Sequence, residues 1–260
     1  MSAIARGVTR ALTRDLTGAA ASGYLRGYAG GGGGGVVLDF NNVVLQLEFE
    51  GTDGDTTTTD VSNSAHTVTL GASSVIDDAQ AATGNTSLWI TSRSTVAGSL
   101  TDWQFGATED FTMEMFVRFN GDPGTAEKPF LATWHLPNNL CLIWWLNNNV
   151  LELQLGNGNA ALGAASAAWN PAGDQWYHVA VCRASGTTEF FVDGTSIGTS
   201  AGLDGITNVN GTTYFNLAIG SYWNSAVQIT NAWFDSIRIV AGQAMYTADF
   251  TPPSAPHPTS

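Results

Sequence analysis

The sequence predicts an all-β protein, a two-sheet antiparallel jelly-roll sandwich preceded by an extended or helical N-terminal arm. From residue 36 onward, short apolar runs alternate with turns rich in Gly, Asn, Asp and Thr, and no segment of helical length and period competes with them. Residues 1–35 differ in charge and pattern. We therefore divide the chain into an anchoring arm (1–28), a glycine-rich hinge (29–35) and a jelly-roll domain (36–260).

The clearest strand is 111–119, where Phe and Met residues alternate with Thr112, Glu114 and Arg118. This period of two predicts a half-buried strand, with the apolar side chains on the core and the polar ones facing solvent. Similar patterns predict strands at 43–49, 65–70, 87–91, 139–146, 150–155, 176–183, 188–192, 213–219 and 233–240.

Turn residues separate several of these runs. Asn147, Asn148 and Asn149 stand between two strands, and Asp193-Gly194 interrupts another pair. These residue types tolerate the positive φ of tight hairpin turns, so neighbouring strands should be antiparallel. Because no crossover helices are expected, a sandwich or jelly roll is the natural way to bury the apolar faces.

The arm contains a four-residue repeat in which an apolar residue, Thr and Arg recur. A helix or an extended strand would place the apolar and basic sets on separate faces, and the spacing leaves both conformations open. Glycines 30–35 follow as a flexible tether. We expect the arm to dock on a partner, although a disordered tail without a partner is the alternative. The predicted docking residues are Ile4, Arg6, Val8, Arg10, Leu12, Arg14 and Leu16.

Charge separates the arm from the domain. The first 35 residues carry four arginines and one aspartate, whereas the remaining 225 carry 5 basic and 21 acidic side chains and a net charge of −16. An acidic domain with one lysine, Lys128, is not expected to bind nucleic acid. No apolar run is long enough for a membrane span, and no secretory signal is evident, so we expect no membrane insertion.

The two cysteines, Cys141 and Cys182, both fall in predicted strands. We expect them to be small buried apolar residues, although they could form a disulfide if their strands are neighbours. Two cysteines without a nearby histidine do not predict a metal site.

Several segments, in this order, resemble the laminin-G-like, concanavalin-A-like jelly rolls, and among them the type found in structural proteins of tailed bacteriophages. The resemblance spans nearly the whole domain. The matching segments are 47–54, 60–66, 109–117, 176–181, 191–194 with 198–199, 234–239 and 246–253.

The resemblance implies a virion structural protein, either a capsid decoration or part of a tail appendage such as a tail fiber. The arm would bind other virion proteins, and the jelly roll would be displayed on the particle exterior after assembly in the host cytoplasm. Repeated particle proteins favour a homo-oligomer, for which we expect a trimer. Adhesion to host-surface glycans would be compatible with this role.

Two alternatives remain open: a free-standing glycan-binding module and a glycoside hydrolase. The second would use Glu48 and Glu50, which should share one face of a strand at a separation near the 5 to 5.5 Å that retaining glycosidases need. However, the Glu-x-Asp-x-Glu arrangement of the related glucanases is absent. No nucleophile motif accompanies the histidines, and His178 is expected to be a hydrogen-bonded core residue. We therefore expect no catalytic site.

Two loops are candidate glycan-binding surfaces, because an aromatic side chain in a polar loop is less easily explained by core packing. One loop contains Trp134 and His135, and the other contains Tyr222, Trp223 and Asn224. By contrast, at least one of the adjacent Trp144 and Trp145 should be in the core.

We expect no cofactor. Calcium binding is an open possibility at Asp53, Asp55 and Asp60, where threonines stand between the acidic residues, but no EF-hand spacing is present.

Overall fold

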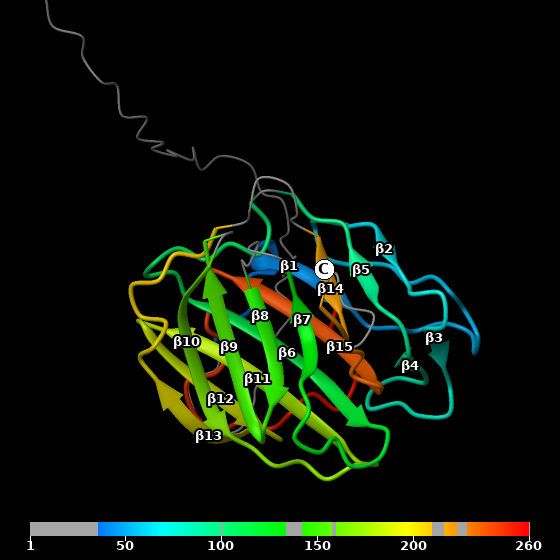
Figure 1. Ribbon diagram of the computed structural model, residues 1–260. Coiled ribbons are helices and arrows are strands. Elements are labelled where there is room, and N and C mark those ends of the chain that lie inside the picture. Colours follow the sequence, from blue (N-terminus) through cyan, green and yellow to red (C-terminus); the bar gives the residue numbers. More distant parts are fainter. Residues whose placement is uncertain are drawn as a thin grey trace, which may run out of the picture.

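The computed structural model describes residues 36–99, 101–133, 142–157, 160–209, 216–222 and 228–259. Two antiparallel β-sheets pack face to face in these residues, and Figure 1 shows the strands of one sheet in front of the other. The predicted two-sheet jelly-roll sandwich is confirmed. The arm and the hinge, residues 1–35, lie outside the described residues, so the predicted docking residues from Ile4 to Leu16 stay predictions.

We call the larger sheet sheet A. Its long strand β15 pairs with β6 on one side, and with both β1 and β4 on the other side, one after the other along its length. A short 3-10 helix, η1 (Phe40–Asn42), precedes β1. The strands in spatial order are β13 (Thr195–Ser200), β12 (Thr187–Val192), β11 (Trp176–Ala184), β6 (Phe111–Phe119), β15 (Ala232–Ala241), β4 (Ser87–Ile90) and β3 (Val75–Asp77), with β1 (Val43–Leu47) beside β15.

Sheet B lies opposite and contains the β8–β9 hairpin. Its strands in spatial order are β10 (Ala161–Ala168), β9 (Val150–Gly156), β8 (Leu142–Asn147), β7 (Lys128–Ala132), β14 (Leu217–Ile219), β5 (Ser94–Val96) and β2 (Val68–Thr69).

The main core fills the space between the sheets. Met113 and Met115 of β6, Trp144 of β8 and Leu153 of β9 all belong to it. Trp145 instead lies on the opposite side of sheet B in a separate small cluster. The expectation that at least one of the two tryptophans is in the core is confirmed by Trp144. Burial of these large apolar side chains is the main contribution to the stability of the sandwich.

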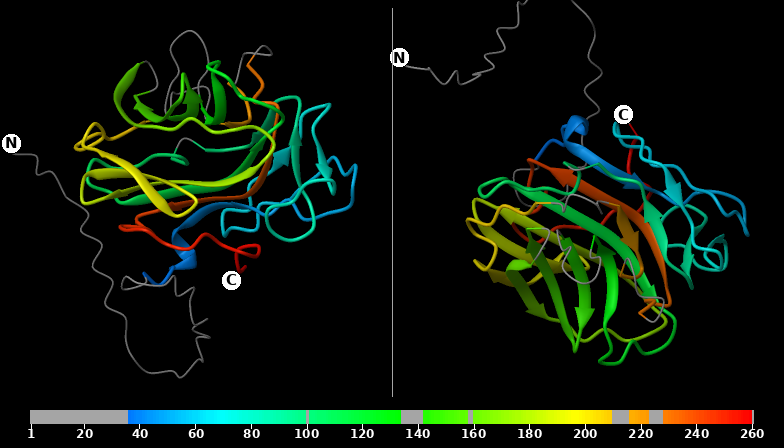
Figure 2. Two further views of the ribbon diagram at one scale, coloured as in Figure 1. Left: turned by 90° about the horizontal axis from the view of Figure 1, so that it is seen from below. Right: turned by 45° about the horizontal axis from the view of Figure 1, so that its top comes forward.

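The outer face of sheet A is not open to solvent, which corrects our expectation for β6. Thr112 and Glu114 were expected to face water, yet both have no exposed surface. The chain after β15 returns across this face, where the rings of Tyr246 and Phe250 stack at 3.5 Å. Figure 2 shows this C-terminal segment on the side of sheet A that faces away from sheet B. Sequence periodicity could not reveal a cover supplied by a segment without regular structure.

The two predicted hairpin turns are present, and their residues have the expected positive φ. Asn148 and Asn149 have φ of 50° and 61° and join β8 to β9, while Asp193 and Gly194 have φ of 50° and 75° and join β12 to β13. Both hairpins are antiparallel.

All ten predicted strands have a counterpart in the structure, and their ends differ. The first strand ends at Leu47 instead of residue 49, because Phe49 has a φ of 55° and leaves the strand conformation. Residues 139–141 and 213–215 of two predicted strands lie outside the described residues. The sequence missed five strands: β3, β5, β7, β10 and β13. They are short or rich in Ala, Gly, Ser and Thr, as in β10, so their hydrophobic alternation is weak.

Cys182 is a buried free cysteine in β11, as we expected. Its thiol contacts the Thr112 hydroxyl at 3.3 Å. Burial raises the pKa of this thiol to about 12. Cys141 lies outside the described residues. Within the described ranges, no helix has the length and apolar character needed to cross a membrane.

The C-terminal segment lies very close to the β12–β13 turn at Gly194. The Phe250 carbonyl oxygen lies where a Cβ of residue 194 would be, and Phe250 N–H donates to the Gly194 carbonyl at 2.8 Å. We expect Gly194→Ala to lower the free energy of unfolding, measured by urea denaturation, by more than the ~1–2 kcal/mol cost of a left-handed alanine. Gly205→Ala is the matched control, because Gly205 has a φ of 71° with nothing near its Cβ position. Equal losses in the two variants would contradict the close approach.

Candidate functional site

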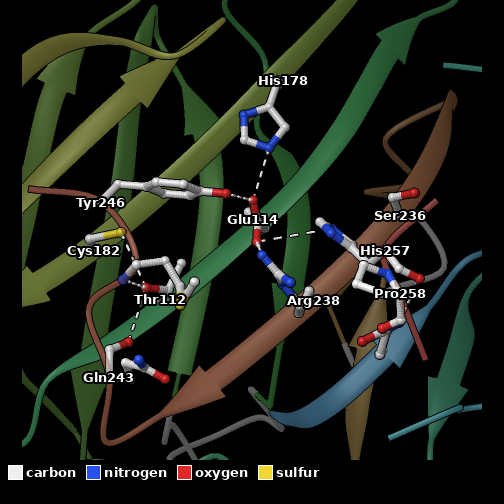
Figure 3. A network of polar contacts seen from close by, with 12 residues as sticks. Thr112, Glu114, His178, Cys182, Ser236, Arg238, Gln243, Tyr246, His257 and Pro258 are labelled. Atoms are coloured by element: carbon white, nitrogen blue, oxygen red, sulfur yellow. Dashed lines mark hydrogen bonds and ion pairs between the residues drawn. The ribbon is translucent and has the colours of Figure 1, made fainter. Parts of the chain in front are cut away.

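A buried carboxylate occupies the centre of the outer face of sheet A. Glu114 Oε1 accepts a hydrogen bond from Arg238 Nε at 2.7 Å, and Arg238 Nη2 donates to the same oxygen. Its Oε2 accepts from the Tyr246 hydroxyl at 2.7 Å and lies 3.1 Å from His178 Nε2. Figure 3 shows these side chains converging on Glu114 from β6, β11, β15 and the C-terminal segment. The expectation that His178 is a hydrogen-bonded core residue is confirmed.

The charges around Glu114 and His257 determine their pKa values. Burial opposes the charged form of Glu114, but the Arg238 charge and the hydrogen bond with His178 outweigh it and hold the pKa of Glu114 well below its usual range. Burial and the nearby Arg238 charge lower the pKa of His257 to about 3. His257 is therefore neutral at physiological pH, and its 3.9 Å separation from Glu114 Oε1 is not a salt bridge. The network fastens the C-terminal segment and leaves no access for a substrate.

Glu48 and Glu50 are not neighbours on a strand face, which corrects the basis of the hydrolase alternative. Glu48 follows the end of β1 and is 8% exposed, and its Oε2 accepts from the Ser236 hydroxyl at 2.8 Å and from His257 N–H at 3.1 Å. Glu50 is exposed and accepts from Asn85 N–H at 3.1 Å. Burial raises the pKa of Glu48, although the Ser236 and His257 hydrogen bonds and the Arg238 charge oppose it.

Both carboxylates nevertheless line one cavity of about 260 Å³. The cavity lies where residues 48–61 leave β1 and pass along the edge of the sandwich. Six of the eight side chains that line it carry oxygen: Glu48, Glu50, Asp55, Thr57, Thr58 and Thr59.

The three acidic residues considered for calcium do not come together. Asp60 is buried and accepts from Gln46 N–H at 3.0 Å, and its Oδ2 lies 2.7 Å from His66 Nδ1. Asp55 accepts from Thr52 N–H at 2.8 Å within its own turn. Asp53 instead lies near two aspartates of the β3 region, and the ligand oxygens of Asp53, Asp77 and Asp78 are within 4.8 Å of one another.

Of the candidate glycan-binding residues, the structure describes only Tyr222. It is 2% exposed, so the expectation of an exposed loop aromatic is wrong for this residue. It packs against Trp145 with the two rings nearly perpendicular and their centroids 6.0 Å apart. Trp134, His135, Trp223 and Asn224 lie outside the described residues.

Tyr222 packs against a surface that the sequence did not predict, the outer face of the β8–β9 hairpin. Ile143 and Trp145 of β8 point away from the core, and their partners across the hairpin are Gln154 and Glu152. We call Ile143, Trp145, Glu152, Gln154 and Tyr222 the β8–β9 platform. The signal was present in the alternation of 150–155, where Glu152 and Gln154 lie between leucines.

The platform combines aromatic and polar groups. Trp145 is 7% exposed, and its buried indole N–H has no hydrogen-bond partner within the described ranges. Glu152 and Gln154 are half-buried, and Gln154 Nε2 donates to Glu152 Oε1 at 2.6 Å. Their partners on β10 are the small residues Ser166 and Ala164, so little side-chain bulk covers this side of the platform. A carboxylate and an amide beside two aromatic rings are the groups that proteins use to bind sugar hydroxyls and sugar rings.

Comparisons with known proteins agree with this architecture. Residues 91–243, more than half of the chain, match the Laminin_G_3 family, described as the concanavalin A-like lectin/glucanases superfamily. The chain therefore belongs to this family. No curated protein sequence matches the chain.

Solved structures with the same fold include binding domains of clostridial toxins. The binding domain of Paraclostridial Mosquitocidal Protein 1 has 12% identity and a TM-score of 0.58, covering 80% of this chain and 50% of that chain. The receptor binding domain of the botulinum neurotoxin C/D mosaic serotype has 10% identity and a TM-score of 0.59, covering 80% and 49%.

The binding domain of Botulinum Neurotoxin DC, solved in complex with SialylT, has 13% identity and a TM-score of 0.58, again covering 80% and 49%. At these identities the likeness shows the fold alone. The present chain spans about half the length of each toxin domain.

The contribution of Glu114 can be measured by removing it. Glu114→Ala leaves Arg238 buried without its carboxylate partner, and we expect the free energy of unfolding to fall by about 3–5 kcal/mol in urea denaturation. Asp204→Ala, at an exposed acidic residue, is the control and should change stability little. A loss for Glu114→Ala as small as that of the control would contradict the role of this network.

Proposed function

We propose that this protein is a non-enzymatic, lectin-like module that binds glycans through the β8–β9 platform. The observation that carries the proposal is the pairing of Trp145 and Tyr222 with the half-buried Glu152 and Gln154 on one face of sheet B. Membership of a superfamily of lectins and glucanases supports a carbohydrate ligand. The toxin structures add support, since one of them is a binding domain in complex with SialylT.

A binding role has more support than hydrolysis. The carboxylates considered for catalysis are each already hydrogen-bonded, Glu48 by Ser236 and His257 N–H and Glu50 by Asn85 N–H. The platform itself offers the half-buried carboxylate of Glu152 and the half-buried amide of Gln154, which can bind a ligand by hydrogen bonds without chemistry.

We further propose that the protein is a virion structural component, a capsid decoration or tail-appendage protein of a bacteriophage. Its N-terminal arm would dock on other virion proteins, and trimerisation would place several copies together. Support comes from the repeated apolar and arginine residues of the arm, the glycine tract behind them and the resemblance of the domain to jelly rolls of phage structural proteins. Display on the particle exterior would bring several platforms to one glycan surface.

The platform is tested by the double variant Glu152→Ala/Gln154→Ala on a glycan array. Each lost hydrogen bond is worth about 1 kcal/mol, so we expect binding to weaken by tenfold or more. Thr199→Ala/Ser200→Ala on the opposite sheet is a control with the same number of polar side chains removed. Array binding that is equal in the platform and control variants would refute the platform as the site.

The arm is tested by deleting residues 1–28. We expect the truncated protein to keep its circular dichroism spectrum and thermal transition, because both sheets are formed by residues from Val43 onward. It should be missing from purified virions that contain the full chain, as measured by mass spectrometry of the particles. Normal incorporation of the truncated protein would defeat the docking proposal, and light scattering of the full chain tests for a trimer.

A further inference from the structure

The cavity at the end of β1 is separate from the β8–β9 platform and is lined mainly by oxygen. Its volume is about 260 Å³, and three carboxylates and three threonine hydroxyls line it together with Phe49 and Val61. Among the residues that the structure describes, no lysine, arginine or histidine lines it. The cavity is therefore acidic and rich in hydrogen-bond acceptors.

Two residues in unusual backbone conformations are associated with the cavity, because Phe49 lines it and Ser236 is hydrogen-bonded to the lining residue Glu48. Phe49 has a φ of 55° and Ser236 has a φ of 45°, a region that bulky or ordinary L-residues rarely adopt. The Phe49 carbonyl accepts from the Thr86 hydroxyl at 2.8 Å, and the Ser236 hydroxyl donates to Glu48 Oε2 at 2.8 Å. These contacts hold the Glu48 carboxyl in place at the cavity.

Glu48 has an unused hydrogen-bonding atom. Its Oε2 is occupied by Ser236 and His257 N–H, whereas its Oε1 is buried and has no partner among the described residues. Because Oε1 is fully buried, it is not exposed to the cavity. The lining residues that can meet a ligand are the exposed Glu50, Asp55, Thr57 and Thr59 and the half-buried Thr58.

The spacing of the carboxylates argues against a single metal ion as the ligand. In the described part of the chain, the one group of three acidic residues with ligand atoms within 4.8 Å of one another is Asp53, Asp77 and Asp78. Glu48, Glu50 and Asp55 are therefore too far apart to coordinate one ion together. A ligand must be larger than an ion to reach them.

We propose that this cavity binds a single uncharged monosaccharide unit as a second glycan site. A sugar ring fits the available volume, its hydroxyls can donate to the carboxylates, and the threonine hydroxyls can donate or accept. Phe49 and Val61 supply apolar surface for the C–H groups of the ring. An acidic sugar would meet the exposed carboxylates of Glu50 and Asp55, with no cation among the described lining residues, and is excluded by this charge.

The inference rests on the proposed glycan recognition but places it at a different site. Burial raises the pKa of Glu48, and the hydrogen bonds from Ser236 and His257 and the Arg238 charge oppose this rise.

The test is saturation-transfer NMR of the full-length protein with free glucose, galactose, mannose and N-acetylglucosamine, and with N-acetylneuraminic acid as the acidic comparison. We expect transfer to at least one neutral sugar and none to N-acetylneuraminic acid. Thr58→Val removes one lining hydroxyl at nearly constant shape and should weaken binding by up to about tenfold. Thr58→Phe fills the cavity and should abolish binding. Thr187→Val, at an exposed threonine of β12, is the matched control and should bind normally.

Each outcome separates this inference from the platform proposal. The proposal is overturned if no neutral sugar shows transfer, if N-acetylneuraminic acid binds equally well, or if binding survives Thr58→Phe in a protein with an unchanged thermal transition. Loss of free-sugar binding in Glu152→Ala/Gln154→Ala, with retention in Thr58→Phe, would assign the sugar to the platform and also overturn it. Loss of array binding in the platform variant, with free-sugar binding retained, would support both sites.

Discussion

The buried Glu114 carboxylate is the interaction on which the rest of the structure depends. It lies at the centre of sheet A and has no exposed surface, so its charge must be compensated within the protein. Arg238 supplies the opposite charge, while Tyr246 and His178 contribute a hydrogen bond each. These partners come from three different parts of the chain. The network therefore specifies which segments meet on this face, a role that a purely apolar contact could fill less selectively.

The same network explains why the C-terminal segment behaves as part of the domain. The Tyr246 hydroxyl donates a hydrogen bond to Glu114, and the His257 N–H donates one to Glu48, so both ends of this segment are fixed to sheet A. The outer face of sheet A is therefore buried beneath this segment, whereas the outer face of the β8–β9 hairpin carries the half-buried Glu152 and Gln154.

Much of the fold follows from local sequence signals. The alternation of apolar and polar residues predicted β6 with both of its ends correct. The Asn and Asp-Gly turns predicted two hairpins. Both predictions succeeded because side-chain period and turn conformation are local properties of the chain. The candidate site was harder to predict. The burial of Tyr222 and of the polar face of β6 depends on segments distant in sequence, and a single sequence does not show which segments pack together. Phe49 illustrates the same limit, since nothing in its residue type indicates the left-handed conformation that ends β1 and turns Glu48 and Glu50 apart.

The entry of the chain into the sandwich has a consequence for orientation. Residues 37 and 39 are hydrogen-bonded to Gln243, just after β15, so the chain joins the domain near sheet A and the C-terminal segment. The β8–β9 platform is on the far side of sheet B. The point where the chain enters the domain and the β8–β9 hairpin are therefore on opposite faces of the sandwich, so an attachment at residue 37 would not obstruct the outer face of that hairpin.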